Sequence, residues 1–359
     1  MSLGIVDPPI SRQQIQQYPE LSNLSILKQP QGTNFAVTPR EAEIFEDLIK
    51  ARESAGEHIM DEPERNFEGR FALLCSETFL PESFFVDCEK LLSNYKQVIL
   101  QGAPGTGKTF IAQKLATWWA GAAGRVQTVQ FHESYGYEDF VYGIKPDYDD
   151  TCKQTFFKPV FGVFLKFCKL AREDAQNRYV LIIDEINRAK ISRVFGELLY
   201  LLEYREKSVV LQSGGEFSIP DNLDIIGTMN TADKSIAVVD YALRRRFAFV
   251  TLKPIDGDKS VVLRRWLEAN HISNDVEIER LFVTLNKVVA AKDENLAIGH
   301  SYFMSKEAVD RGRFPNDLLE FTWRYRILPL AAEYEYELTA SQIDEKYGLD
   351  AIKRLSKSS

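Results

Sequence analysis

Short apolar runs alternate with helical patterns through the middle of the chain. Four of these runs are too short for helices and are bounded by polar or turn residues, so each predicts a buried strand. They occupy residues 98–100, 127–131, 179–183 and 223–229. Three other segments, residues 84–92, 110–119 and 160–171, place apolar side chains at helical spacing. The alternation predicts an α/β fold, with a mostly parallel sheet covered by helices on both faces.

Two further segments, residues 145–159 and 208–220, have the pattern of β-hairpins. In the second, a Ser-Gly-Gly turn separates two short apolar stretches, which is typical of a hairpin. After Pro254 the chain is helical in pattern and carries no strong strand signal. We therefore expect a helical region to follow the sheet.

Residues 1–65 differ from the rest, because they are rich in turn residues and show no sustained periodicity. One helix is predicted there, from a cap at Thr38 to Lys50, with a proline in its first turn. We expect this segment to be a linker or a fragment of an upstream domain. Residues 66–254 then form the α/β core, and residues 255–359 form the helical region and the C-terminal tail.

The composition is that of a soluble globular protein. Of 359 residues, 45% are hydrophobic and 27% are charged, and no apolar run approaches the length of about 18–20 residues that a membrane helix needs. The start of the chain lacks the basic and apolar regions of a secretory signal. The formal charge of −8 argues against a surface that coats nucleic acid, but it leaves room for a local basic strip or pore.

The cysteines show no disulfide or metal pattern. None of the four forms a Cys-x-x-Cys pair, and the four histidines do not complete a zinc spacing; the cysteines are Cys75, Cys88, Cys152 and Cys168. We expect reduced thiols in a cytoplasmic protein.

A glycine-rich loop follows the first predicted strand and precedes a predicted helix. It comprises Gly102, Ala103, Pro104, Gly105, Thr106, Gly107, Lys108 and Thr109. Glycines let successive backbone N–H groups turn toward phosphate oxygens, and the start of the helix adds its positive end. Lys108 is expected to reach the β- and γ-phosphates, and Thr109 to place its hydroxyl on Mg²⁺. The loop therefore predicts a nucleoside triphosphate site.

Polar residues end two of the later strands. Asp184 and Glu185 follow the run at 179–183, where Asp184 suits a metal ion and Glu185 suits activation of a water molecule. Asn230 follows the run at 223–229, and its amide can orient the attacking water or sense the γ-phosphate. In order along the chain, these residues predict the remaining parts of a hydrolytic site.

Three consecutive arginines, Arg244, Arg245 and Arg246, occupy a predicted helix. They cannot share one helix face, so at least one should point away from its own core. In a ring of subunits, such an arginine can reach the γ-phosphate of a neighbour and stabilise charge in the transition state.

Together these elements resemble an AAA+ NTPase, and several segments resemble the McrB-type motor subunits of modification-dependent restriction systems. These segments are Gln130–Tyr135, Asp184–Ala189, Met229–Ser235, Asp240–Phe247 and Ile298–Phe303. The sequence Met-Asn-Thr-Ala-Asp at the start of the third is the most specific to this family. The resemblance covers residues 80–335, and it implies that the C-terminal helical region is a lid.

The resemblance also implies a hexameric ring, Mg²⁺ as cofactor, and GTP rather than ATP as the characteristic substrate. It implies a separate McrC-type nuclease partner, with DNA bound through the assembled complex or an upstream domain. Asn230 and Asp233 would place the water or couple to the partner, and Arg245 or Arg246 would act across the subunit interface. His132 and His300 are more typical of structural histidines, and His300 is in addition a candidate for sensing nucleotide from the lid.

Two features depart from the family, and two other functions stay open. Lys234 stands where the family often has Arg, and no modification-reading domain is recognisable in residues 1–65. One alternative is a MoxR-like ATPase that remodels a protein partner. The other is a nucleotide-gated assembly platform with little turnover.

Weaker signals favour ordinary structural roles. Aromatic residues after the second strand could stack on bases, but their acidic neighbours favour packing at a helix start; they are Tyr135, Tyr137, Phe140 and Tyr142. The first predicted hairpin contains three lysines, which are more typical of a solvated loop than of the lining of a ring pore; they are Lys145, Lys153 and Lys158.

Overall fold

The structure is a computed structural model that describes residues 67–149, 154–232, 241–293 and 296–358. The chain divides into the units Met1–Arg70 and Phe71–Ser359. Of the first unit, only the short helix α4 (Phe67–Arg70) is described, so the predicted helix from Thr38 lies outside the described residues.

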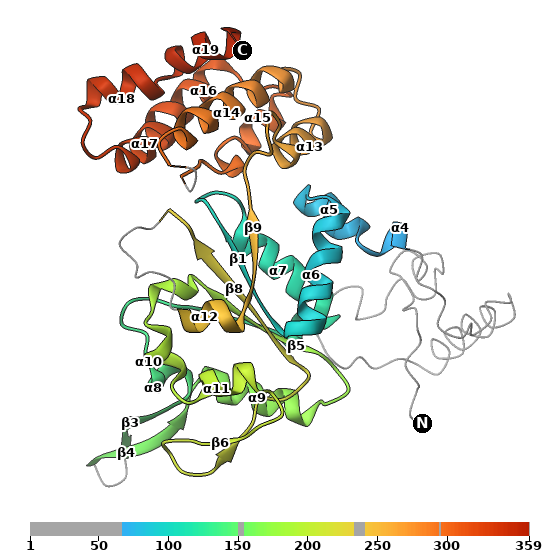
Figure 1. The fold of residues 1–359 in the computed structure, drawn as a ribbon, viewed down its shortest axis with the longest axis vertical. Helices are drawn as coiled ribbons and strands as arrows, with labels where there is room; N and C mark the ends of the chain where they lie inside the picture. Colours follow the sequence, from blue (N-terminus) through green and yellow to red (C-terminus); the bar gives the residue numbers. More distant parts are fainter. Residues whose placement is uncertain (1–66, 150–153, 233–240, 294–295, 359) are drawn as a thin grey trace, which may run out of the picture. The chain divides into compact units, whose positions relative to one another are not determined.

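Five parallel strands form the central sheet of the second unit, in the order β2-β5-β8-β1-β9 (Figure 1). They are β1 (Gln97–Gly102), β2 (Val126–Gln130), β5 (Tyr179–Asp184), β8 (Leu223–Asn230) and β9 (Ala248–Leu252). The α/β prediction is thus confirmed, and each of the four predicted strands is present. The three central strands are buried along most of their length, because helices cover both faces of the sheet.

Helices cover the two faces as two groups, which Figure 1 shows on either side of the sheet. One group is α5 (Ala72–Thr78), α6 (Glu82–Tyr95) and α7 (Lys108–Ala120). The other is α8 (Tyr137–Phe140), α9 (Val163–Glu173), α10 (Ile191–Phe195), α11 (Leu198–Glu203) and α12 (Tyr241–Arg246). Alternate residues of β1 serve the two cores: Val98 and Leu100 pack with the first group, and Ile99 packs with the second.

Strand β9 was not predicted. It pairs in parallel with β1 at the edge of the sheet, and only its last residue, Leu252, is buried. Residues 247–250 are nevertheless consecutive apolar residues, and Phe249 packs on one core while Val250 packs on the other, so a strand signal was present in the sequence.

Both predicted hairpins are present. The first pairs β3 (Tyr142–Asp149) with β4 (Gln154–Phe161), and the second pairs β6 (Val209–Val210) with β7 (Glu216–Phe217). The expected packing of the aromatic residues is confirmed for Tyr137 and Phe140, which are buried in α8. Lys145 and Lys158 are directly opposite each other in the first hairpin, whereas the side chain of Lys153 lies outside the described residues.

After β9 the chain is helical, as predicted. The helices are α13 (Val261–Ala269), α14 (Asp275–Ala290), α15 (Lys306–Asp310), α16 (Asn316–Thr322), α17 (Leu328–Tyr334), α18 (Ala340–Tyr347) and α19 (Leu349–Ser358). They gather in one bundle, drawn orange to red in Figure 1, around a hydrophobic cluster of their own. The cluster includes the fully buried Trp323, whose indole N–H donates to the carbonyl of Tyr347.

None of the helices in the described ranges combines the length and apolar composition needed to cross a bilayer. Cys75, Cys88 and Cys168 are free thiols, as expected, and burial raises the pKa of Cys88 and of Cys168 to about 12. Cys152 lies outside the described residues.

Candidate nucleotide-binding site

The glycine-rich loop connects the end of β1 to the start of α7. Gly105 and Gly107 have φ values of +79° and +81°, a backbone region that glycine adopts without steric cost. The ammonium of Lys108 is buried against the loop and donates to the carbonyls of Gly102 (3.1 Å) and Ala103 (2.9 Å). Gly107 caps α7 without a side chain, so no side-chain oxygen of its own competes for the first N–H groups of the helix. The loop therefore has the cradle and the cation that a phosphate group needs.

Asp184 lies where the loop, β5 and β8 meet. One of its oxygens, Oδ1, accepts hydrogen bonds from the hydroxyls of Thr109 and Thr228, each at 2.6 Å. The hydroxyl of Thr228 in turn accepts from the backbone N–H of Glu185 at 3.1 Å. Hydroxyl and carboxylate oxygens are the ligands that Mg²⁺ prefers, so Thr109 and Asp184 form a suitable donor set.

Glu185 has an unusual backbone and a restrained side chain. Its φ and ψ of 54° and 47° are left-handed, which is strained for a residue with a side chain and is typical of functional positions. Its Oε1 accepts from the amide of Asn230 at 2.6 Å, and its Oε2 lies 3.6 Å from Nε of Arg188. The structure thus joins Glu185 and Asn230 directly.

A segment between α14 and α15 closes over the glycine-rich loop. The N–H groups of Gly299 and Ser301 donate to the carbonyls of Pro104 and Gly105, both at 3.0 Å. A Cβ on Gly299 would lie 1.9 Å from the carbonyl carbon of Gly105, so only glycine fits there. Asn286 holds this segment from α14, because its side chain exchanges two hydrogen bonds with the backbone of Ile298.

His300 lies inside this contact and is 6% exposed. Its Nε2 is 4.0 Å from the position that a Cβ on Gly107 would take. Burial lowers the pKa of His300 to about 4, so the imidazole is neutral at pH 7. The structure therefore places His300 beside the phosphate loop.

The arginines of α12 lie at the opposite end of β1. The side chain of Gln97, the first residue of that strand, donates to the carbonyl of Arg246 at 2.7 Å, whereas the phosphate loop begins at its last residue. Arg246 is 18% exposed and forms an ion pair with Glu203 at 3.0 Å. Arg245 is 75% exposed, and its Nη2 lies farther from the same carboxylate, at 3.5 Å. The structure therefore does not bring these arginines to the phosphate loop of their own chain.

Sequence reasoning missed Thr228 and Arg188 as neighbours of the acidic pair. Thr228 is two residues before Asn230 on β8, so the period of a strand places both side chains on one face. The alternation of side chains along this strand could therefore have indicated that Thr228 lies on the same face as Asn230. Asp233 and Lys234, by contrast, lie outside the described residues.

Two protein families match separate parts of the chain. Residues 97–247 match the family described as "AAA domain (dynein-related subfamily)". Residues 277–342 match "McrB, alpha-helical lid domain". The first match covers the chain from β1 to α12, which includes four of the five strands of the central sheet, and the second covers most of the C-terminal helical bundle.

Individual relatives agree with these families. The chain is 38% identical over 277 residues to "Type IV methyl-directed restriction enzyme EcoKMcrB subunit" of Escherichia coli K12, which covers 73% of this chain and 59% of the relative. It is 26% identical over 195 residues to "Type II restriction enzyme BsuMI component YdiS" of Bacillus subtilis, covering 43% and 56%. The match to a crystal structure from Cytophaga hutchinsonii covers 86% of this chain and 98% of the matched chain, with a TM-score of 0.34 and 15% sequence identity.

The chain spans less than two thirds of the length of these two relatives. The range matched by the AAA domain includes the phosphate loop and the acidic pair, and the range matched by the lid domain lies in the C-terminal helical bundle. This chain belongs to the McrB-like AAA+ proteins.

Proposed function

We propose that this chain is a ring-forming NTPase that hydrolyses GTP, powers movement along DNA and activates a separate McrC-type nuclease. The observation that carries the proposal is the 2.6 Å hydrogen bond between Thr109 and Asp184. It joins the phosphate loop to the acidic end of β5, which is the arrangement that a magnesium-dependent NTPase requires.

The residues of this site fit a nucleotide with Mg²⁺. Lys108 would neutralise the β- and γ-phosphates after leaving the loop carbonyls that it now contacts. Thr109 and Asp184 would hold the ion, which supplies positive charge at the phosphate oxygens. His300, neutral and beside the loop, would contact the nucleotide from the lid.

Hydrolysis then depends on Glu185. Its carboxylate accepts a proton from a water molecule as the water oxygen bonds to the γ-phosphorus and the bond to the nucleoside diphosphate breaks. The amide of Asn230 donates a hydrogen bond to Glu185, which supports a role for Asn230 in orienting that water. By resemblance, Asp233 assists in the same step.

The position of α12 supports a ring. Arg245 and Arg246 lie at the end of β1 that is remote from their own phosphate loop, so a contact with γ-phosphate would be made in a neighbouring subunit. A hexamer is the assembly that the family resemblance implies. Nucleotide would then bind between subunits.

The restriction role rests on the relatives. The two relatives are named as a subunit and a component of restriction enzymes. We expect the corresponding nuclease to be a separate polypeptide, and DNA to be bound by the assembled complex or by an upstream domain.

The test is the rate of GTP and ATP hydrolysis, measured side by side with and without a purified McrC-type subunit. Preferential GTP hydrolysis that the subunit accelerates is the expected result. Hydrolysis of ATP alone, indifferent to that subunit, contradicts the proposal and supports a MoxR-like ATPase. Tight nucleotide binding with negligible turnover under every condition supports an assembly platform.

A further inference from the structure

One buried amide holds the segment between α14 and α15, residues 296–303, which we call the lid segment. Asn286 of α14 is buried, and its Oδ1 accepts a hydrogen bond from the N–H of Ile298 at 2.8 Å. Its Nδ2 donates to the carbonyl of Ile298 and to that of Phe282, one turn earlier in α14, both at 3.1 Å. These bonds engage the oxygen and both N–H groups of the amide, so its orientation is fixed.

Two further contacts tie the lid segment to the helical bundle. The phenol of Tyr334 in α17 donates to the carbonyl of Ala297 at 3.0 Å. The side chain of Ile298 is fully buried in the hydrophobic cluster of the bundle. One side of the lid segment is therefore part of the bundle, and Asn286 and Tyr334 set its position.

The other side of the lid segment covers the phosphate loop. The N–H of Gly299 donates to the carbonyl of Pro104 at 3.0 Å. The N–H of Ser301 donates to the carbonyl of Gly105 at the same distance. A loop of this kind binds phosphate oxygens through its N–H groups and not through its carbonyls. The contact therefore restrains the loop without using the donors that a nucleotide needs.

The lid segment and the phosphate loop are in direct contact. A Cβ on Gly299 would lie 1.9 Å from the carbonyl carbon of Gly105, and a Cβ on Gly105 would lie 2.6 Å from Cε2 of Tyr302. The guanidinium of Arg326 lies over the other side of this contact, 4.8 Å from the centroid of the Tyr302 ring. A shift of the lid segment toward the loop would displace the loop, and a shift away would break both hydrogen bonds.

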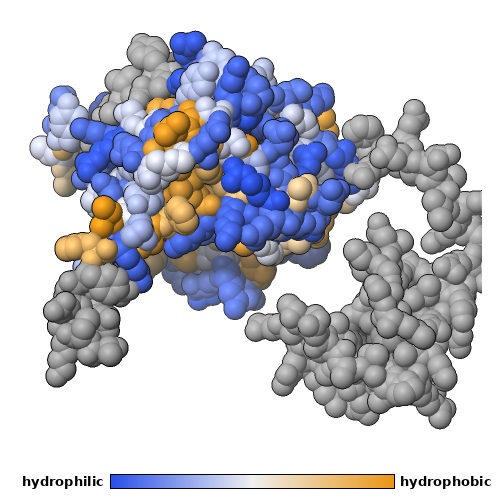
Figure 2. Space-filling model, turned by 90° about the horizontal axis from the view of Figure 1, so that it is seen from below, coloured by the Kyte–Doolittle hydropathy of each residue, from blue (hydrophilic) through white to orange (hydrophobic). Residues whose placement is uncertain are grey.

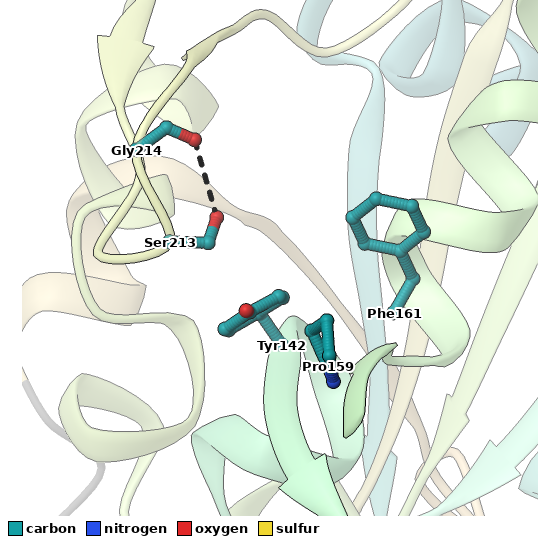
Figure 3. Close-up of a pocket in the computed structure, with 5 residues that line it drawn as sticks. All are labelled: Tyr142, Pro159, Phe161, Ser213 and Gly214. Carbon is teal, nitrogen blue, oxygen red and sulfur yellow. Dashed lines mark hydrogen bonds between the residues drawn. The ribbon is translucent and has the colours of Figure 1, made fainter. Parts of the chain in front are cut away.

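A pocket near the two hairpins is a poor alternative site for a nucleotide. Apolar surface is exposed on this side of the molecule, which Figure 2 shows from below. The pocket has a volume of about 320 Å³ and is lined by Tyr142, Pro159, Phe161, Ser213 and Gly214 (Figure 3). None of these five residues carries a charge. Phosphate groups favour cations and N–H donors, which the loop beneath the lid segment supplies.

We propose that Asn286 is a positioning residue of the nucleotide site, which holds the phosphate loop in its binding conformation by fixing the lid segment on it. Asn286 acts through Gly299 and Ser301 and does not itself touch the nucleotide. Binding then requires less ordering of the loop, because the loop is ordered when the chain folds. This rests on the proposed function only in that the loop binds a nucleoside triphosphate, and not on GTP preference, the ring or the nuclease.

The test uses Asn286→Leu and Gly299→Ala in the full chain. The first removes the three hydrogen bonds of the amide at similar volume, and the second inserts a Cβ between the two backbones without altering the core of the bundle. Asn274→Leu is the matched control, because the Asn274 amide makes the same pair of hydrogen bonds, both at 2.9 Å, with the backbone of Phe314, outside the lid segment. Affinity for fluorescent GTP and ATP analogues is measured by equilibrium titration, and kcat and KM by steady-state hydrolysis.

Asn286→Leu and Gly299→Ala should each raise the Kd for nucleotide at least about tenfold, a factor that the loss of two hydrogen bonds of ordinary strength can produce. KM should rise with the Kd, whereas kcat at saturating nucleotide should fall by a smaller factor, because Glu185 and Asn230 lie outside this contact. Since both changes break one contact, the double variant should lose less affinity than the product of the two factors. Asn274→Leu should lower the melting temperature, as Asn286→Leu does, but should leave the Kd unchanged.

Different results overturn different proposals. An unchanged Kd in Asn286→Leu or in Gly299→Ala refutes the positioning role and leaves the proposed function intact. Tighter nucleotide binding in either variant also refutes it, because the lid segment would then obstruct the loop. An equal rise in Kd in Asn274→Leu assigns the effect to general loss of stability and refutes it as well. Absence of nucleotide binding by the unaltered chain refutes both this proposal and the proposed function.

Discussion

Thr228 gives a sharp test of how the acidic pair is organised. Its hydroxyl donates to Asp184 and accepts from the N–H of Glu185, so one side chain holds both carboxylate residues. Thr228→Val keeps the shape of the buried side chain and removes both hydrogen bonds. The N–H of Glu185 then loses this acceptor at a residue whose backbone is already strained.

The size of the effect follows from these two contacts. A hydrogen bond to a charged group contributes about 1.5–3 kcal/mol, and a buried donor left without an acceptor costs about 1–3 kcal/mol. If about 2–3 kcal/mol of this appears in the transition state, kcat falls about 30- to 150-fold. Nucleotide affinity should change much less, because Lys108 and the loop are unaltered.

The assay is steady-state NTP hydrolysis as a function of Mg²⁺ concentration, together with binding of a fluorescent nucleotide. Thr251→Val is the matched control, since its hydroxyl accepts a hydrogen bond from Gln101 on the adjacent pair of strands, away from the acidic residues. Thr228→Val should lower kcat and raise the Mg²⁺ requirement, while Thr251→Val should leave both unchanged. Normal kcat and Mg²⁺ dependence in Thr228→Val would refute the reasoning.

Three further predictions concern other parts of the chain. Arg245→Ala should reduce hydrolysis at least about 100-fold with little loss of stability, because this side chain is 75% exposed and can reach a neighbouring subunit. Arg246→Ala should mainly lower the unfolding free energy, because it removes the closer ion pair with Glu203. Turnover and denaturant unfolding distinguish the two. In the unfolded chain His300 takes up a proton below about pH 6.5, whereas in the folded chain it stays neutral down to about pH 4. The free energy of unfolding should therefore fall by about 3 kcal/mol as the pH is lowered across that range, and this fall should be absent in His300→Gln. Equal pH profiles of the variant and the unaltered chain would contradict this prediction. Glu335→Gln should lower the unfolding free energy by about 2–3 kcal/mol at pH 7, since Glu335 accepts hydrogen bonds from Lys292, Lys346 and Tyr347; a normal urea midpoint would contradict this.

The features that sequence reasoning predicted are those with local signals. The phosphate loop, the central strands and both hairpins are contiguous patterns, and β1, β5 and β8, which are buried on both sides, contain consecutive apolar residues at positions 98–100, 179–183 and 225–226. Resemblance across several short segments then led to the McrB-like family, which the matching lid confirms.

Features that depend on distant contacts were not predicted. The role of Thr228 arises because β5 and β8 are adjacent in the sheet, although 44 residues separate Thr228 from Asp184. The need for glycine at position 299 arises from the backbone of Gly105, far away in sequence. The difference between Arg245 and Arg246 likewise depends on Glu203 and Gln97, which lie on other elements.

Nucleotide hydrolysis by Glu185→Gln tests the central claim most directly. This variant keeps the size of the side chain and removes its ability to accept a proton from water. Nucleotide binding should be retained and hydrolysis should fall to background, while the control Glu320→Gln, at an exposed position of α16, should hydrolyse normally. Hydrolysis by Glu185→Gln at the rate of the unaltered chain would contradict the account, because the proton would then have to leave by another route.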